Sequence, residues 1–205
     1  MAGCSSILSF DYDADSVQCT EVLRQNAGDP SHWRVQQGSV LDATFMSSLG
    51  EYDVVYSWGV LHHTGDQWRA IQQAKDCVKP GGLLYIALYT SEVFPRGRAE
   101  MWIKIKKLYN TSHPFIQRLL VWLYAALHCC VMVLRGVNPY RFIRTYSESR
   151  GMNYLIDVRD WLGGFPMEFS SINEVVKELC RKSDFALINL KYGEANTEYL
   201  FRRNK

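Results

Sequence analysis

Apolar residues in the first part of the chain fall into short runs that alternate with stretches of helical periodicity. The runs predict strands at 5–10, 33–37, 52–56 and 83–89, and apolar residues at helical spacing predict helices at 17–25 and 67–78. A strand, a helix and another strand in this order indicate parallel strands joined by crossover helices. The predicted fold class is therefore α/β, with a doubly wound, mostly parallel sheet.

This alternation ends with the α/β part, residues 1–90, and a helical insertion rich in aromatic side chains follows over residues 91–170. An insertion of this length is more often functional than idle. The remaining residues, 171–205, predict a helix at 173–182 and an antiparallel pair of strands at 185–191 and 197–203 that closes the sheet.

An acidic cluster follows the first predicted strand. Asp15 or Ser16 is expected to cap the helix that begins there, because a short polar side chain can accept hydrogen bonds from the free amides of a first turn. The turn Gly28-Asp29-Pro30 is expected to end that helix, and Lys79-Pro80-Gly81-Gly82 to end the next one.

Composition and charge restrict the class of protein. The 205 residues are 47% hydrophobic and 21% charged, which is typical of a globular chain that can bury one core. A formal charge of +2, spread along the chain, is too small to indicate a nucleic-acid surface, so neither DNA nor RNA is an expected partner. The six cysteines show no CxxC spacing and indicate free thiols in a reducing cytoplasm. No metal is expected, since Cys129 and Cys130 beside His128 point in diverging directions.

One segment raises the question of a membrane. Residues 119–134 are uncharged and lie between Arg118 and Arg135, but they fall short of the roughly 20 residues that span a bilayer. A buried or lid helix is the favoured interpretation, and a weak interfacial membrane contact is the alternative. The first residues lack the basic region and cleavage site of a signal peptide, so a cytoplasmic protein is expected.

Four sequence blocks occur in the order and at the spacing of a known family. They are residues 9–16 (SFDYDADS), 37–42 (QGSVLD), 52–63 (YDVVYSWGVLHH) and 78–82 (VKPGG). Together they resemble class I S-adenosylmethionine-dependent methyltransferases, most closely the small-molecule branch that includes the ubiquinone-pathway O-methyltransferases. Residues 193–199 are similar to the final hairpin of such enzymes. The resemblance implies a Rossmann-like sheet, S-adenosylmethionine as the cofactor and methyl transfer to a small-molecule acceptor, with O-methylation favoured.

The resemblance assigns the ribose of the cofactor to Asp11. In an open α/β sheet, ligands lie outside the carboxyl ends of the strands, where a carboxylate can accept hydrogen bonds from both ribose hydroxyls. Tyr12 would then form an apolar wall beside the nucleoside. The alternative is that Asp11 caps a helix or is solvated, although Asp13 and Asp15 are better placed for that role.

Gly38, Ser39 and Val40 are expected beside the adenine. A glycine lets the backbone approach a ring closely, and the Ser39 hydroxyl can bond to the ring edge, where many relatives carry an aspartate. A plain turn is the alternative interpretation. Asp42 is a second candidate for this polar contact, and it could equally cap the helix that follows.

The segment after the third predicted strand is where the methyl donor and acceptor should meet. Ser57 and Trp58 are expected to contact the cofactor. His62 or His63 is the candidate base, because an imidazole titrates near neutral pH and can take a proton from a phenol or hydroxyl. The alternative is that one histidine packs against the cofactor and the other supports a helix, since alignment of donor and acceptor can supply much of the catalysis.

The helical insertion is the expected source of substrate selectivity. Its aromatic residues suit a flat or lipid-like acceptor, although each could equally belong to the insertion's own core. They are Trp102, Tyr109, Phe115, Trp122, Tyr124, Tyr140, Phe142, Tyr146 and Trp161. Its basic residues could bind an anionic substrate or lipid surface, or form a solvated face. They are Lys104, Lys106, Lys107, Arg135, Arg141 and Arg144. The turn at 161–166 (WLGGFP) returns the chain to the sheet, and its glycines could permit close approach to a ligand.

The family's glycine-rich cofactor loop has no counterpart in these residues. No GxGxG occurs, and the resemblance places the loop, with the family's first and central strand, before Met1. A non-catalytic binding or scaffold protein derived from this fold is therefore the alternative to an active methyltransferase, and an unrelated α/β protein is the third interpretation.

Overall fold

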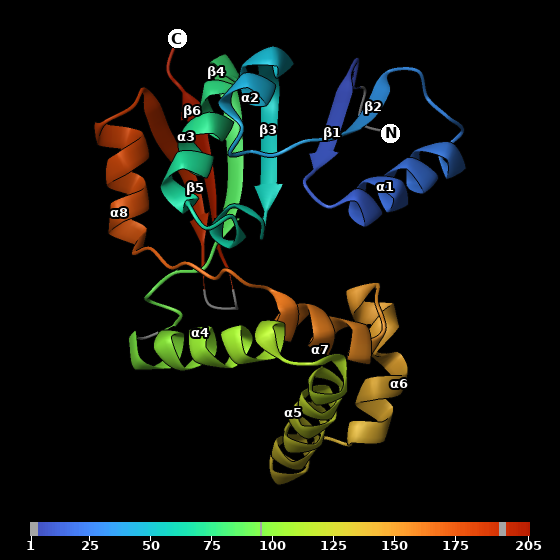
Figure 1. The fold of residues 1–205 in the computed structure, drawn as a ribbon. Coiled ribbons are helices and arrows are strands. Elements are labelled where there is room, and N and C mark those ends of the chain that lie inside the picture. The colour runs from blue at the N-terminus through green and yellow to red at the C-terminus, as the bar shows by residue number, and fades with distance from the viewer. Residues whose placement is uncertain (1–3, 95, 193–195) are drawn as a thin grey trace.

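The structure is a computed structural model that describes residues 4–94, 96–192 and 196–205 (Figure 1). Residues 193–195, the start of the hairpin block, lie outside the described residues. The elements in chain order are β1 (Ile7–Asp11), α1 (Ala14–Asn26), β2 (Trp33–Gln37), α2 (Ala43–Leu49), β3 (Tyr52–Trp58), η1 (Leu61–His63), α3 (Gln67–Asp76), β4 (Val78–Leu88), α4 (Arg96–Thr111), α5 (Pro114–Leu134), α6 (Pro139–Arg150), α7 (Tyr154–Gly163), α8 (Ile172–Val176), η2 (Lys177–Arg181), β5 (Phe185–Lys191) and β6 (Thr197–Arg203).

The described strands form two sheets, and the α/β fold class is confirmed. β1 pairs with β2 in parallel, and a second sheet has the order β3-β4-β6-β5. β3 and β4 are parallel, whereas β6 runs antiparallel to both β4 and β5. The C-terminal strands therefore form the expected antiparallel pair, with β6 inside the sheet and β5 at its edge.

The strand–helix rhythm led us to expect one sheet, and that expectation is wrong for the described residues. β1 and β3 run the same way in Figure 1, but each pairs along one edge only. The unpaired edge of β1 and the unpaired edge of β3 are where the resemblance implies a further, central strand. One face of β3 is also uncovered: Val54, Tyr56 and Trp58 are 57%, 66% and 44% exposed.

The main core lies between the four-stranded sheet and the helices α2, α3 and α8 with η2. Ile71 of α3, Leu84 of β4 and Leu179 of η2 are fully buried in it. The two sheets are connected through aromatic packing, because Phe10 of β1 contacts Phe45 of α2 edge to face at 5.1 Å between ring centroids. This contact keeps the ends of β1 and β2 beside the larger sheet.

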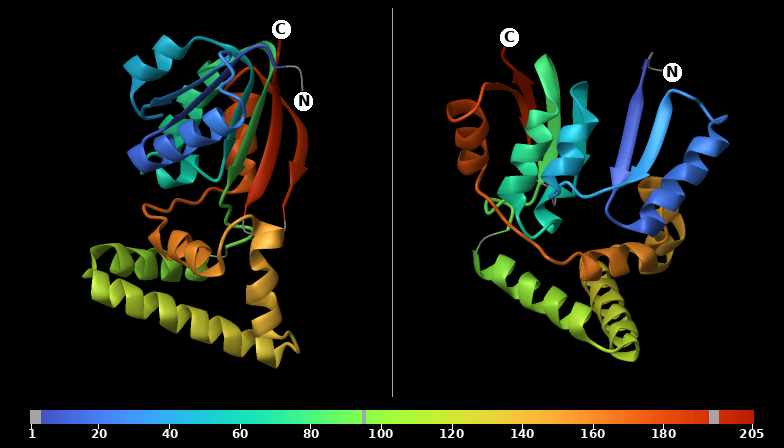
Figure 2. Two further views of the ribbon diagram at one scale, coloured as in Figure 1. Left: turned by 90° about the vertical axis from the view of Figure 1, so that its right-hand side faces the viewer. Right: turned by 45° about the horizontal axis from the view of Figure 1, so that its top comes forward.

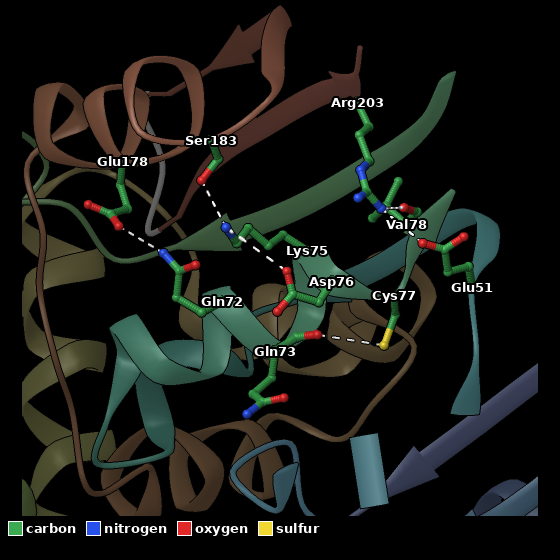
Figure 3. Close-up of polar contacts among 10 residues, drawn as sticks. All are labelled: Glu51, Gln72, Gln73, Lys75, Asp76, Cys77, Val78, Glu178, Ser183 and Arg203. Carbon is green, nitrogen blue, oxygen red and sulfur yellow. Dashed lines mark hydrogen bonds and ion pairs between the residues drawn. The ribbon is translucent and has the colours of Figure 1, made fainter. Parts of the chain in front are cut away.

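Polar contacts fasten the larger sheet at the amino ends of β3, β4 and β5, which is the end away from the helical insertion (Figures 1 and 3). Arg203 at the end of β6 donates to the Val78 carbonyl and pairs with Glu51. Lys75 of α3 donates to the Ser183 hydroxyl at 2.9 Å. A hollow of about 210 Å³ between α2 and α3 lies at this same end. Since ligands of open α/β sheets bind at the carboxyl ends of strands, this hollow is not the expected site.

Helices α4 to α7 form a separate helical unit at the carboxyl ends of the strands (Figures 1 and 2). One apolar cluster joins α5 and α7 through Val121, Ala125 and Val158, with Trp102 of α4 packed against it. A second cluster, around Tyr89 and Phe94, connects the unit to the end of β4. The unit therefore covers the strand ends without adding strands of its own.

Capping residues explain where the helices differ from the predicted limits. α1 begins earlier than expected because Asp13, not Asp15 or Ser16, is its cap and accepts the Ser16 amide at 2.8 Å. α5 begins at Pro114 and has 21 residues, because Pro114 suits a first helical position and His113 caps the turn. Lys79 to Gly82 lie within β4 and shift its register against β3, and α3 already ends at Asp76.

Candidate functional site

The candidate site lies where the carboxyl ends of β1, β2 and β3 face the helical unit (Figure 1). β1 ends at Asp11, β2 at Gln37 and β3 at Trp58. The structure brings the predicted ribose and adenine residues together: the Gly38 amide donates to the Asp11 carbonyl at 2.9 Å. The Gln37 side chain also donates to the Tyr12 carbonyl at 3.0 Å.

The Asp11 side chain is suited to an acceptor role at the end of β1. Oδ1 accepts the Asp13 amide at 2.9 Å, and within the described residues no group donates to Oδ2. Helix capping falls to Asp13, so Asp11 does not cap α1. Tyr12 is 78% exposed, with its ring available as a wall.

The turn after β2 has a steric reason for its glycine. A Cβ on Gly38 would lie 2.1 Å from Cζ of Phe45, which is an impossible contact. The Ser39 hydroxyl accepts the Leu41 amide at 3.1 Å and retains its own proton for donation. Val40 is only 9% exposed and packs in the main core, which leaves its backbone as the part that can meet a ligand.

Asp42 caps α2, accepting the amides of Thr44 and Phe45. Of the two roles considered for this side chain, capping is the one the structure shows. Ser39 and the backbone of this turn therefore remain the candidates for the predicted polar contact with adenine.

A sharp turn follows β3. Ser57 pairs with Ile86 of β4 and Trp58 is the last residue of the strand. Gly59 has a φ of 77°, in the left-handed region that favours glycine, and its amide donates to the Ala87 carbonyl at 3.1 Å. The turn directs the chain into η1, which carries both histidines.

His62 is fully buried at the centre of an aromatic cluster. Its ring lies 3.9 Å from that of Tyr89 and 4.4 Å from that of His63, measured between centroids. Neither ring nitrogen has a well-formed hydrogen bond to another described residue. Burial lowers the pKa of His62 to about 2, with His63 and Lys106 acting in the same direction, so this imidazole is neutral at physiological pH.

His63 is half-buried and held by the loop after α7. Its Nδ1 lies 2.6 Å from the Pro166 carbonyl oxygen. A carbonyl can only accept, so Nδ1 carries the proton and Nε2 of the neutral ring is left with its lone pair. Burial lowers the pKa of His63, the bond to Pro166 opposes that shift and the charge of Lys106 reinforces it.

Lys106 of α4 approaches the same loop from the helical unit. Its side chain is 1% exposed, its ammonium group donates to the Trp161 carbonyl, and Nζ lies 4.2 Å from the centroid of the Trp161 ring. Burial lowers the pKa of Lys106 to about 8. Within the described part of the chain no carboxylate pairs with this ammonium group.

Gly164 lies between His63 and Lys106. A Cβ built there would be 3.1 Å from Cε1 of His63 and 3.3 Å from Nζ of Lys106. The glycines of 161–166 were expected to permit close approach to a ligand; in the structure Gly164 permits close approach of these two side chains instead.

The segment from residue 165 to 170, called the strap below, fastens the helical unit to the sheet. The Glu168 amide donates to the His62 carbonyl at 2.9 Å, and its carboxylate accepts the Gln67 amide at the start of α3. Thr90 and Ser170 form a parallel bridge just after β4. The strap thus positions both histidines from a segment about a hundred residues further along the chain.

Sequence reasoning found the two histidines and named Lys106 only among the basic residues that could bind an anion, and it did not name Tyr89 or Glu168 as site residues. The signal for Lys106 was weak, because a lysine inside a helix reads as a solvated residue. Within residues 4–94, 96–192 and 196–205, no group of three or more histidine, cysteine, aspartate or glutamate side chains is suited to hold a metal ion.

Comparison with known proteins identifies the family. A methyltransferase-domain model matches residues 2–137, which is most of the chain. A tRNA U34 carboxymethyltransferase from Geobacter sp. (strain M21) is 26% identical over 167 residues, covering 78% of this chain and 48% of that protein. The chain therefore spans about half the length of this curated relative.

Solved structures support the fold. PKMT2 from Rickettsia typhi in complex with AdoHcy has a TM-score of 0.60 at 14% identity, covering 98% of this chain and 46% of that one. An O-methyltransferase family protein from Burkholderia thailandensis has a TM-score of 0.53 at 15% identity, covering 98% of this chain and 43% of that one. The methyltransferase-domain match indicates S-adenosylmethionine as the cofactor. The chain belongs to the methyltransferase-domain family and has its class I, Rossmann-like fold.

Proposed function

We propose that this protein transfers a methyl group from S-adenosylmethionine to the oxygen of a small-molecule acceptor. Bound S-adenosylmethionine supplies an electrophilic methyl group, so the protein's task is to align the acceptor and to accept its proton. The observation that carries the proposal is the fixed tautomer of His63, whose Nδ1 is 2.6 Å from the Pro166 carbonyl. A neutral imidazole with a free Nε2 lone pair is the form required of a general base.

The requirement for a base favours oxygen as the methylated atom. A neutral hydroxyl must lose its proton as it is methylated, whereas a neutral amine can react through its lone pair first. Burial and the nearby Lys106 charge lower the pKa of His63, which keeps the ring deprotonated near neutral pH. His63 would therefore be ready to accept a proton across the physiological range.

His62 supports the site in another way. Its pKa of about 2 excludes a role as a base at neutral pH, and its ring packs at a tilt of 40° against that of Tyr89. We assign it to the wall of the acceptor site, with Tyr89 beside it. The two histidines therefore have different proposed roles: His63 is the base, and His62 packs beside the acceptor.

The cofactor's adenosine half fits the turn residues of the smaller sheet. Asp11 would accept from the ribose hydroxyls through its free Oδ2, Ser39 would donate to the adenine edge, and Tyr12 would cover the nucleoside. Gly38 and Val40 would contribute backbone only. Ser57 and Trp58 at the end of β3 would lie on the other side of the cofactor.

The acceptor would be flat and largely apolar. His62 contacts Tyr89, and Tyr89 in turn contacts the rings of Phe94, Trp161 and Phe169 with centroids 5.4 to 6.1 Å apart. Aromatic walls of this kind suit a planar acceptor that presents one hydroxyl to the base.

A non-catalytic binding or scaffold protein is the second candidate. The observation that favours it is the division of the described strands into two sheets with a free edge on both β1 and β3. The non-catalytic candidate requires that the full-length protein methylate no acceptor and that a protein partner co-purify with it.

The experiment is calorimetric titration of the full-length protein with AdoHcy, followed by methyl transfer from labelled S-adenosylmethionine to a panel of phenols, amines and carbon acids. We expect His63→Gln to lower turnover of a phenol by roughly a hundredfold or more while AdoHcy binding is retained. His62→Phe should remain within a few-fold of the original protein. His32→Gln, on an exposed loop, is the matched control. Absence of AdoHcy binding would refute the proposal, and unchanged turnover in His63→Gln would remove the base.

A further inference from the structure

The outer face of α5 is an exposed apolar stripe. Its members repeat at helical spacing along the whole helix and are 43% to 86% exposed. They are Phe115, Ile116, Leu119, Trp122, Leu123, Leu127, Val131, Val133 and Leu134. An exposed apolar patch of this length on one face indicates an interaction surface.

The opposite face of α5 is packed. Val121, Ala125 and Met132 are buried, and His128 bonds through Nδ1 to the Tyr154 hydroxyl at 2.8 Å. The helix is therefore apolar on all sides, but only 17% of its most apolar window is buried inside the protein. A core helix of the same composition would be mostly buried, so core packing explains one face and not the other.

By length and composition, α5 is the one helix in the described residues that could cross a membrane. Its packed face excludes that arrangement, because α6 and α7, which contact it, carry exposed Arg144, Arg159 and Asp160. Crossing would place these charges in hydrocarbon. Figures 1 and 2 show α5 as the part of the helical unit farthest from the sheet, with α4 and α7 in between. The stripe can therefore reach a flat surface without obstruction.

Charge is divided unevenly between the two parts of the chain. Residues 96–163 hold 11 lysines and arginines against 4 aspartates and glutamates, a net charge of +7, whereas the remaining residues carry −5 within the total of +2. Arg118 and Arg135 stand at the two ends of the stripe, and Arg141 and Arg144 are exposed on α6 beside it. The apolar stripe is thus framed by cations.

We infer that α5 lies in the interface of an anionic lipid membrane, with the stripe in the acyl region and the flanking arginines at the headgroups. An apolar helical face framed by basic residues is the arrangement that binds such surfaces. A second copy of the chain is disfavoured, because it would bring two units of net charge +7 together. Nucleic acid is disfavoured because seven of the nine stripe residues are aliphatic and offer no plane for base stacking, and only Phe115 and Trp122 are aromatic.

This inference is independent of methyl transfer. It would hold for the non-catalytic alternative, and its failure would leave the assignments of Asp11 and His63 untouched. It does give a reason for a lipid-like acceptor, since the unit that covers the site would then lie on the membrane.

The test is flotation of the full-length protein with vesicles of phosphatidylcholine alone or with 30% phosphatidylglycerol. We expect binding to the anionic vesicles and much weaker binding to the neutral ones or in 0.5 M salt. Leu119→Glu/Leu123→Glu/Leu127→Glu should reduce binding at least tenfold, and Arg118→Gln/Arg135→Gln by about fivefold for each charge removed.

The matched control is Leu187→Glu/Ile188→Glu/Tyr192→Glu, which places the same three charges on exposed apolar residues at and just after β5 and should float like the original protein. Circular dichroism melts exclude unfolding as the cause of any loss. Failure of the original protein to float with anionic vesicles would overturn the inference, as would equal flotation of the triple variant. Sedimentation showing a dimer that only the triple variant dissociates, or displacement of vesicles by added RNA, would assign the stripe to those partners instead.

Discussion

Gly164, just before the strap, provides the sharpest test of how His63 is held, because the adjacent Gly163 is its natural control. Both glycines have backbone conformations that alanine can adopt, with φ of −67° at Gly164 and a helical conformation at Gly163. A Cβ at Gly163 would meet only Tyr109 at 3.8 Å, which is an ordinary contact. A Cβ at Gly164 would lie 3.1 Å from His63, 3.3 Å from the Asp160 carbonyl and 3.3 Å from Lys106.

These distances set the expected magnitudes. Gly163→Ala should gain about 0.5 kcal/mol, because the unfolded chain loses freedom and nothing in the folded state is displaced. Gly164→Ala must move a ring and an ammonium group by a few tenths of an ångström, which costs roughly 1–2 kcal/mol. The two variants should therefore differ by about 2 kcal/mol in the free energy of unfolding, or about 4–8 °C in melting temperature.

The assay is a pair of thermal melts with turnover measured alongside. We expect Gly164→Ala to lose activity beyond its loss of stability, because the displaced group is the proposed base His63, and Gly163→Ala to retain activity. Equal melting temperatures and equal turnover in the two variants would show that the close packing at Gly164 does not position His63 as described.

Three further outcomes are expected. The acid limb of kcat/KM should follow the pKa of His63, which lies below the usual 6.5, and Lys106→Met should move that limb to higher pH because it removes a charge that disfavours imidazolium; a pH profile measures both. Gly38→Ala should weaken AdoHcy binding and lower the melting temperature, and Phe45→Ala added to it should recover part of the loss by removing the ring that blocks the Cβ. Asp11→Asn should reduce AdoHcy affinity in calorimetry by roughly tenfold with little change in melting temperature.

Each of these has a contrary result that decides it. An acid limb that does not move in Lys106→Met would show that the two groups do not interact. A Gly38→Ala variant that Phe45→Ala fails to improve would place the damage elsewhere than in the ring contact. For Asp11, the comparison is Asp13→Ala, which should destabilise α1 by removing its cap and leave AdoHcy affinity unchanged; equal effects on affinity would contradict a direct ribose contact.

Much of the fold could be predicted because its signals are local. The strands at Trp33–Gln37, Phe185–Lys191 and Thr197–Arg203 have the limits that the sequence predicted for them. Helix limits were less accurate because they depend on which of several polar residues makes the cap, as with Asp13. The division into two sheets could not be predicted from the strands themselves, since β1 and β3 have the apolar character of central strands whether or not a neighbour lies on each side.

The candidate site was predictable on the adenosine side and much less so on the acceptor side. Asp11 and Gly38 each stand directly at a strand end, which sequence periodicity can locate. The contact between His63 and Pro166 spans 103 residues, and no local pattern encodes it. The exposed face of α5 was equally hidden, because a helix that is apolar on all sides has the same sequence whether protein or lipid covers it.

The burial of Lys106 connects stability with the proposed chemistry. A lysine whose folded pKa of about 8 lies below its unfolded value near 10.5 loses protons on folding, so the unfolded state binds more protons between these values. Stability attributable to this residue therefore rises with pH across that window and is lowest below pH 8, where the buried ammonium group is fully charged. The protein keeps that charge close to His63 all the same. Burial is the main cause of the lowered pKa of His63, and the Lys106 charge adds to it, so the charge that costs stability also helps to keep the proposed base deprotonated.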